Sequence, residues 1–224
     1  MQHAIENRPV FTTLKITLMQ GETVRAEAGA MVSMSPTLAL KSRTQGRGLG
    51  GMLKAAIGGE GIFASEFTAE SGGGELVLAP PTPGDILVVE LQGQTLFAQG
   101  GAYLAGSPGL EISTQGSLKA LVSGEGLFLQ KILGAGTVFL ASYGALFERR
   151  LGPAEHYIVD TGHLVAFEES VTYSVRKAAR SLVSTLISGE GLVGDFQGPG
   201  RLWIQSRNLR GFAQVIQRLL PGKS

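Results

Sequence analysis

The chain has 224 residues, of which 43% are hydrophobic and 17% charged, and its formal net charge is +1. The absence of cysteine excludes disulfides, thiolate metal sites and a cysteine nucleophile, and the near-zero charge argues against a chain built to bind nucleic acid. Glycine accounts for 33 residues, about twice its usual share, and it alternates with apolar runs in a way typical of short strands joined by tight turns.

Residues 1–18 lack the basic segment followed by an apolar segment that marks a secretory signal, so none is expected. The most apolar stretch, residues 126–147, is interrupted by Gln130, Lys131 and several glycines. Because its apolar residues alternate as in strands, we expect no transmembrane helix.

A Gly-Glu-Gly motif occurs three times, beginning at positions 59, 124 and 189 and thus at equal intervals of 65 residues. Equal spacing predicts that one structural unit is written three times along the chain. The residues of the motif are Gly59, Glu60, Gly61, Gly124, Glu125, Gly126, Gly189, Glu190 and Gly191.

The residues on either side of each motif also repeat. A Gly-x-Gly and an apolar β-type run follow the motif, within residues 72–79, 134–142 and 198–206. Two apolar residues four positions apart precede it and predict a short helical turn with one apolar face. These pairs are Leu53 and Ile57, Leu118 and Val122, and Val183 and Ile187.

Clusters of proline and glycine at residues 80–85 and 152–155 predict boundaries between the units. We therefore expect three β-sandwich repeats, over residues 1–82, 83–153 and 154–224. The fold class is all-β, with three tandem units and a short C-terminal helix. Small sandwiches have exposed sheet edges, which neighbouring repeats could cover by packing side by side.

The expected helix spans residues 208–222, with Asn208 as its N-cap and Pro221-Gly222 as its stop signal. Docking of its apolar face on the chain's own sheets is favoured over binding of a membrane. That face is formed by Leu209, Phe212, Val215, Ile216, Leu219 and Leu220.

The three Gly-Glu-Gly motifs, the Gly-x-Gly segments and the chain length together resemble the "altered inheritance of mitochondria" family over residues 3–206. The resemblance implies a fold like that of the tryptophan RNA-binding attenuation protein, with three double-stranded β-helix-like sandwiches per chain. It also implies homotrimers whose sandwiches form a ring of pseudo-ninefold symmetry. Fungal mitochondrial relatives are linked to inner-membrane organisation. No enzymatic activity comes with the family, so no catalytic residue is carried over.

Two interpretations of the repeated segments remain open. The motif glycines suit a tight turn or bulge, whereas the glutamates, repeated around a ring, could bind a cation or a basic partner. The segments that precede the motif could pack between sandwiches, or they could present apolar tips edged by basic residues to a membrane or protein partner. The structural interpretation is favoured in both cases.

Other chemistries find little support. The histidines, His3, His156 and His163, form no His-x-His pair of the kind that cupin-type metal enzymes use. The chain contains neither the glycine-lysine spacing of a phosphate-binding loop nor a Gly-x-Ser-x-Gly elbow. We expect no metal, no cofactor, no catalytic residue and no nucleic acid partner.

The leading functional hypothesis is a non-enzymatic homotrimeric scaffold or interaction platform in the cytoplasm, with a membrane surface or a protein as candidate partner. The alternative is a module that binds a small ligand or an ion between adjacent sandwiches. A cupin-like metal enzyme is a weaker alternative. Sequence alone identifies neither the partner nor the ligand.

Overall fold

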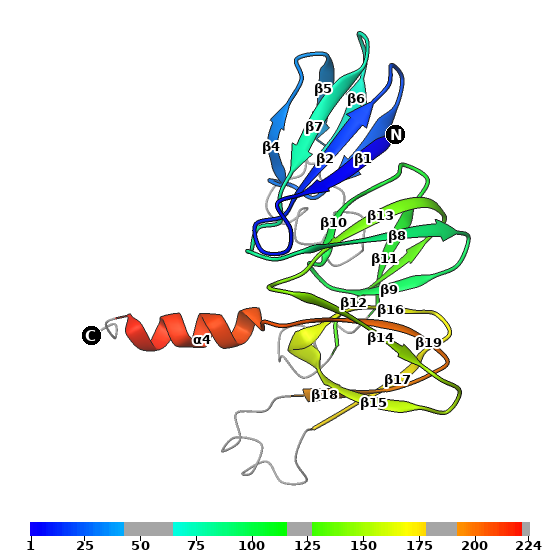
Figure 1. The fold of residues 1–224 in the computed structure, drawn as a ribbon, viewed down its shortest axis with the longest axis vertical. Coiled ribbons are helices and arrows are strands. Elements are labelled where there is room, and N and C mark those ends of the chain that lie inside the picture. The colour runs from blue at the N-terminus through cyan, green and yellow to red at the C-terminus, as the bar shows by residue number, and fades with distance from the viewer. Residues whose placement is uncertain (43–64, 116–126, 178–191, 221–224) are drawn as a thin grey trace.

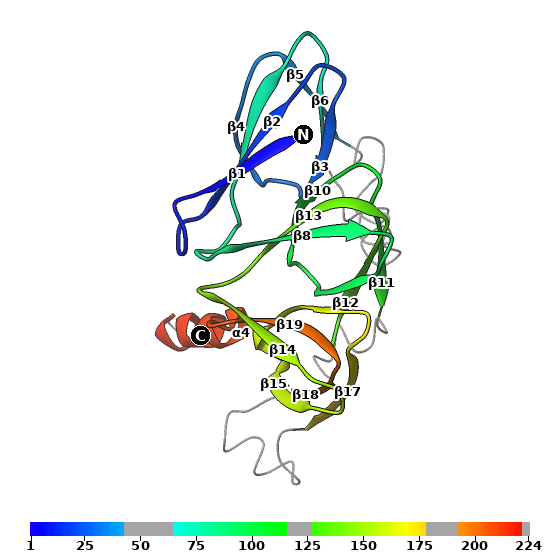
Figure 2. The ribbon, with the colours of Figure 1, turned by 45° about the vertical axis from the view of Figure 1, so that its right-hand side comes forward.

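The computed structural model describes residues 1–42, 65–115, 127–177 and 192–220. The regular elements of the described chain are almost all strands, followed by one C-terminal α-helix. The predicted all-β class is therefore confirmed. Figures 1 and 2 show the three repeats following one another along the long axis of the molecule.

No helix among the described residues is long and apolar enough to cross a bilayer.

The first repeat begins with an extra strand that the other two repeats lack. Its strands are β1 (Gln2–Glu6), β2 (Thr13–Leu18), β3 (Thr23–Ala26), β4 (Met31–Met34), β5 (Leu38–Ser42), β6 (Ser65–Ala69) and β7 (Gly74–Leu78).

The second repeat runs from the first residue of β8 to the last residue of β13. Its strands are β8 (Ile86–Gln92), β9 (Leu96–Gln99), β10 (Tyr103–Gly106), β11 (Glu111–Gln115), β12 (Leu129–Leu133) and β13 (Ala135–Ala141).

The third repeat begins with β14, before the boundary expected at residue 154, because β14 pairs with β19 of this repeat, and it ends in the helix. Its elements are β14 (Leu146–Leu151), β15 (His156–Asp160), the 3₁₀ turn η1 (Thr161–His163), β16 (Leu164–Glu168), β17 (Thr172–Lys177), β18 (Leu192–Gln197), β19 (Gly200–Gln205) and α4 (Leu209–Leu219).

Each repeat builds one sandwich of two antiparallel layers. One layer has the order β2-β7-β4, β8-β13-β10 or β14-β19-β16, and the other has the order β5-β6-β3, β11-β12-β9 or β17-β18-β15. The equivalence extends to single residues, because each of β4, β10 and β16 has a register shift at the same place. The shifts lie between Met31 and Ser33, between Tyr103 and Ala105, and between Leu164 and Ala166.

Strand pairing continues from one repeat into the next. The pair β3·β10 fuses two layers into a six-stranded sheet, and the pair β9·β16 does the same one repeat later. At the first junction Ala105 lies opposite Ala26, and at the second Ala166 lies opposite Ala98. The same residue type therefore stands on both sides of each junction.

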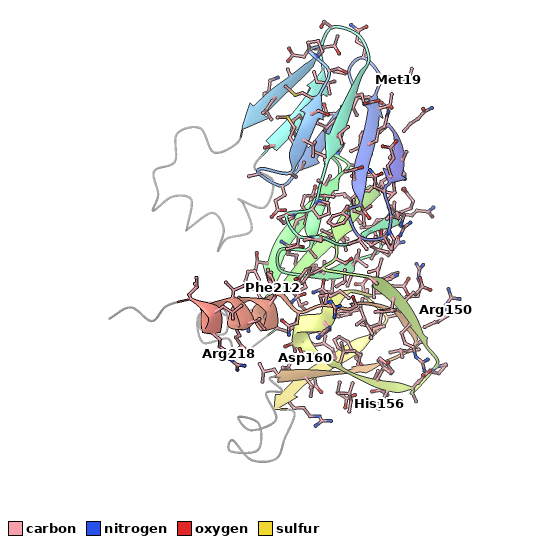
Figure 3. The ribbon with its side chains drawn as sticks, turned by 60° about the vertical axis from the view of Figure 1, so that its left-hand side comes forward. Met19, Arg150, His156, Asp160, Phe212 and Arg218 are labelled. Carbon is pink, nitrogen blue, oxygen red and sulfur yellow. The ribbon has the colours of Figure 1, made fainter. Side chains whose placement is uncertain are left out.

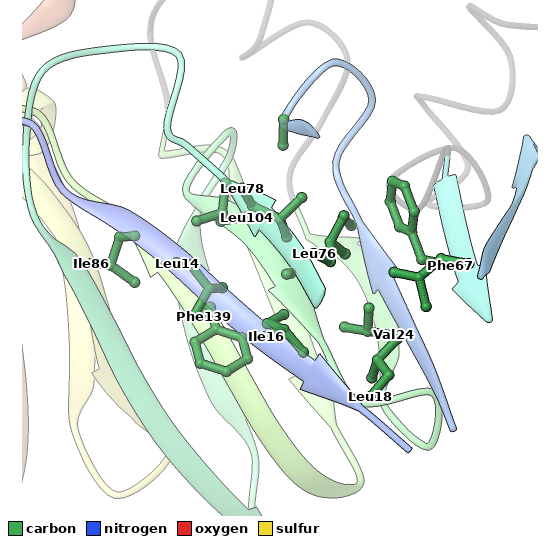
Figure 4. Close-up of a cluster of buried hydrophobic side chains, with 14 of the residues drawn as sticks. Leu14, Ile16, Leu18, Val24, Phe67, Leu76, Leu78, Ile86, Leu104 and Phe139 are labelled. Atoms are coloured by element: carbon green, nitrogen blue, oxygen red, sulfur yellow. The ribbon is translucent and has the colours of Figure 1, made fainter. Parts of the chain in front are cut away.

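Strands at the junctions are buried on both faces. Within β13, Phe139 belongs to the first core, whereas its neighbours Val138 and Leu140 belong to the second. Figure 4 shows Phe139 beside Leu14 and Ile16 of the first repeat. Because successive side chains of a strand point to opposite faces, one fused sheet closes two cores.

The third core follows the same rule. Trp203 of β19 contributes to the second core, whereas Leu202 contributes to the third. Hence three hydrophobic cores alternate with four sheets along the molecule.

The Phe139→Ala variant is expected to lower the free energy of unfolding by about 3–5 kcal/mol, because the side chain is fully buried and truncation leaves a cavity. Denaturation in guanidinium chloride measures the effect. The matched control is Phe147→Ala on β14, whose ring is half exposed and whose loss should cost less than about 1 kcal/mol. An equal loss of unfolding free energy in the two variants would contradict the assignment of Phe139 to the first core, which residues of the first two repeats form together.

Candidate interaction surfaces

The sandwich at each end of the chain leaves one strand edge without the neighbour that its equivalents have. Strand β10 pairs with β3, and β16 pairs with β9, but among the described strands the equivalent strand β4 pairs only with β7. At the other end of the chain, β15 is equivalent to β3 and β9, yet β18 is its only partner in the described part of the chain. Strands β4 and β15 are thus the two halves of a junction that the described residues of one chain do not form.

The side chains of β4 differ from those of its equivalents in exposure. Val32 is 59% exposed, whereas Leu104 and Val165 at the same position are 0% and 1% exposed. Met31 and Met34 are also exposed. An exposed apolar edge strand is a ready template for another strand, and it is unusual in a chain that buries the corresponding residues twice.

Strand β15 shows the same contrast. Tyr157 and Ile158 are exposed, whereas Val24 and Leu96, which occupy the position of Tyr157 in the other repeats, are buried. Within β15, only Val159 is buried, and it belongs to the third core. The two open edges are therefore both apolar, and they lie at opposite ends of the chain (Figure 1).

Helix α4 forms a second exposed apolar surface. Its predicted N-cap is confirmed, since the Asn208 side chain accepts hydrogen bonds from the backbone N–H groups of Arg210 (3.0 Å) and Gly211 (3.3 Å). The expectation that the helix docks on its own sheets is wrong. No residue of α4 is buried, and the helix projects away from the strands (Figure 3).

The remaining candidate residues from the sequence lie outside the described part of the chain. They belong to the segments 43–64, 116–126 and 178–191. These segments contain the Gly-Glu-Gly motifs (Gly59, Glu60, Gly61, Gly124, Glu125, Gly126, Gly189, Glu190 and Gly191) and the apolar pairs before them (Leu53, Ile57, Leu118, Val122, Val183 and Ile187). Their roles stay predictions.

The histidines lie apart and have separate partners. His156 Nδ1 lies 2.9 Å from an Asp195 carboxylate oxygen, and His163 Nδ1 lies 2.8 Å from the backbone oxygen of Gln205. His3 packs edge-on against the Phe139 ring. Within the described residues, no three side chains of the His, Cys, Asp and Glu types come together in a metal-binding group.

The junction between the first two repeats contains an ion pair. Arg8 donates to both carboxylate oxygens of Asp85, at 2.8 and 2.9 Å. The buried Asp85 also accepts from the Ile86 backbone N–H (2.8 Å) and from the Thr12 hydroxyl (3.3 Å). These contacts satisfy the carboxylate inside the protein and tie the start of the second repeat to the first.

A second carboxylate at this junction is Glu27, which directly follows β3. Its backbone N–H donates to Leu104 at 2.9 Å and so extends the β3·β10 ladder. Burial raises the pKa of its side chain above the ordinary value of 4.5, because water hydrates the charged carboxylate less well in a half-buried site and ionisation is therefore disfavoured.

Known proteins resemble this chain along its full length. The family model described as mitochondrial biogenesis AIM24 matches residues 3–207. An uncharacterized protein of Streptococcus pyogenes serotype M6 is 33% identical over 233 residues, covering 100% of this chain and 93% of the relative. An X-ray crystal structure of a Streptococcus pyogenes protein matches with a TM-score of 0.84 at 28% identity, covering 98% of this chain and 99% of that chain.

The Glu27→Gln variant is expected to be more stable than the original chain at pH 7 and no more stable at pH values well below 4.5. A carboxylate with a raised folded-state pKa destabilises the fold once it ionises, and this penalty vanishes when both folded and unfolded states are protonated. Thermal unfolding at the two pH values measures the difference. Glu111→Gln, at an exposed position, is the control. Destabilisation of Glu27→Gln at pH 7 would instead indicate that the carboxylate has a cationic partner.

Proposed function

The chain belongs to the mitochondrial biogenesis AIM24 family, and from this premise we propose that it is a non-enzymatic scaffold whose copies join head to tail. Strand β15 of one copy pairs with β4 of the next, so that each intermolecular junction repeats the two junctions within the chain. The observation that carries this proposal is the exposure of Val32, whose equivalents Leu104 and Val165 are buried at the internal junctions.

The internal junctions supply the register of the proposed pairing. Ala105 and Gly106 lie opposite Ala26 and Arg25, and Ala166 and Phe167 lie opposite Ala98 and Phe97. Transferred to the open edges, this register puts Ser33 opposite Val159 and Met34 opposite Ile158 of the neighbouring copy. The strands are antiparallel, as at both internal junctions.

The proposed pairing also covers the third core. The six-stranded sheets place Phe139 over the first core and Trp203 over the second. The equivalent residue in the first repeat is Val77, which pairs with Ser33. A neighbouring copy would therefore bring Val32 and Val77 toward the exposed side of the third sandwich. Burial of this apolar surface favours association by about 25 cal/mol for each Å² removed from water.

Head-to-tail contacts use two different surfaces, so they close into a ring or continue as a filament. We adopt three copies as the expected number, because the family resemblance implies a trimer with nine sandwiches. Such a ring would present three copies of every exposed feature on one rigid frame, which suits a platform for partners. The absence of cysteine suits a reducing compartment, and we place the scaffold in the cytoplasm.

Size-exclusion chromatography with light scattering tests the assembly. We expect the original chain to have about three times the 23.4 kDa mass of one copy. Val32→Asp should shift it toward the monomer, since a buried unpaired carboxylate is costly at the junction. Val10→Asp, an exposed position away from β4, is the matched control and should leave the mass unchanged. If the original chain has the mass of a monomer at micromolar concentration, the proposal is wrong.

Disulfide trapping tests the register, and the chain offers a background free of cysteine. The double variant Met34→Cys with Ile158→Cys should form covalent oligomers under mild oxidation, because directly opposed residues lie within disulfide reach. Met34→Cys with Tyr157→Cys is the control, since Tyr157 points to the other face of β15. Equal cross-linking of both pairs, seen on non-reducing gels, would show that β4 and β15 do not pair in this register.

A further inference from the structure

The apolar stripe of α4 is largely uncovered by the described residues of the chain. Six large apolar side chains are between 40% and 76% exposed. A helix has 3.6 residues per turn, so the spacing of the first five places them along one side, and the sixth directly follows the helix. They are Leu209, Phe212, Val215, Ile216, Leu219 and Leu220.

The remaining side of the helix is basic. Arg210 and Arg218 flank Gln214 there, at spacings of four residues. The sequence contains no aspartate or glutamate after Asp195. The charged side chains that the helix itself carries are therefore all of one sign, which matches an anionic surface.

The direction of the helix is fixed at its base. The Arg207 backbone N–H donates to the backbone oxygen of Tyr143 at 3.1 Å, and the Tyr143 ring meets the Phe212 ring edge-on with centroids 6.1 Å apart. Asn208 packs so closely on Gly162 that a Cβ there would lie 2.2 Å from its amide nitrogen. These contacts fix the first turn of α4 to the body of the protein. The helix therefore projects in a defined direction with its apolar stripe exposed (Figure 3).

A second apolar group lies on the same side of the molecule. Parallel bridges join Phe11 to Gly84 and Gly84 to Gly144, which places the beginning of each repeat in one row that ends next to Tyr143. Phe11 is 74% exposed, and Val10 is also exposed. Figures 1 and 2 show the loop between β1 and β2 and helix α4 emerging from the same side.

We propose that α4 is an interfacial anchor, which lies on an anionic lipid bilayer with its apolar stripe inserted between the headgroups and its arginines facing the phosphates. A helix of 11 residues is about 16 Å long, too short to span a bilayer, which takes about 20 residues. Helices with one apolar and one basic side bind in the plane of the interface. The Val10 and Phe11 loop supplies a second contact.

This anchoring does not require the head-to-tail assembly, because one chain carries the complete helix and its base. Assembly would strengthen membrane binding, because each copy adds one helix and several linked helices bind with greater avidity than one.

Co-sedimentation of the full chain with vesicles tests the proposal. The probes are phosphatidylcholine vesicles with and without phosphatidylserine. We expect binding to the anionic vesicles, about tenfold weaker binding to the neutral ones, and weakening by added salt. Ile216→Asp should reduce binding at least about tenfold, because it places a charge in the apolar stripe. Gln217→Asp adds the same charge one residue later on the polar side and should change binding by less than about threefold.

Four results decide the interpretation. Val32→Asp should still bind with lower avidity, and its failure to assemble would leave the anchor standing. Absence of binding of the original chain to anionic vesicles, or equal losses for Ile216→Asp and Gln217→Asp, would overturn the anchor. So would a fall in the mass of the lipid-free protein caused by Ile216→Asp alone, because the stripe would then cover a second copy. Circular dichroism confirms that the exposed substitutions leave the fold intact.

Discussion

The pairing of β3 with β10 and of β9 with β16 is the interaction on which the rest of the structure depends. Each pair turns two short three-stranded layers into one six-stranded sheet. A three-stranded layer on its own is close to the lower limit of independent stability. Because the repeats share sheets, the side chains on both faces of β10 and β13 are buried. Each repeat therefore does not have to form a separate core without its neighbours.

The same sharing explains why the ends of the chain differ from its middle. An internal repeat receives a neighbour on either side, whereas the first repeat leaves β4 open and the third leaves β15 open. Proteins usually protect such edges with charged residues, proline or bulges. Here exposed apolar residues stand on both edges, among them Val32 and Ile158, although β4 also has a register shift. This contrast between the ends and the middle of the chain is the basis of the proposed head-to-tail assembly.

The sequence predicted the architecture at the level of local pattern. The recurring Gly-Glu-Gly motif identified three units, and the spacing of apolar residues together with Asn208 identified α4. The fused sheets could not be predicted from the sequence, because a pair such as Ala105 and Ala26 joins residues far apart in the chain and depends on strand register. The docking of α4 was mispredicted for a related reason. A helical stripe shows that a surface is apolar but does not show what covers it.

Burial of β10 and β13 on both faces also governs how the protein comes apart. These strands cannot leave the second core without uncovering the first, and Trp203 links the second core to the third sandwich in the same way. Local unfolding of the middle repeat would therefore cost almost as much as global unfolding, whereas the outer strands β1 and β17 can open alone. In hydrogen exchange, the slowest amides should thus gather at the centre of the chain. The repeats are three in sequence, but their shared sheets lead us to expect that they unfold as one cooperative unit.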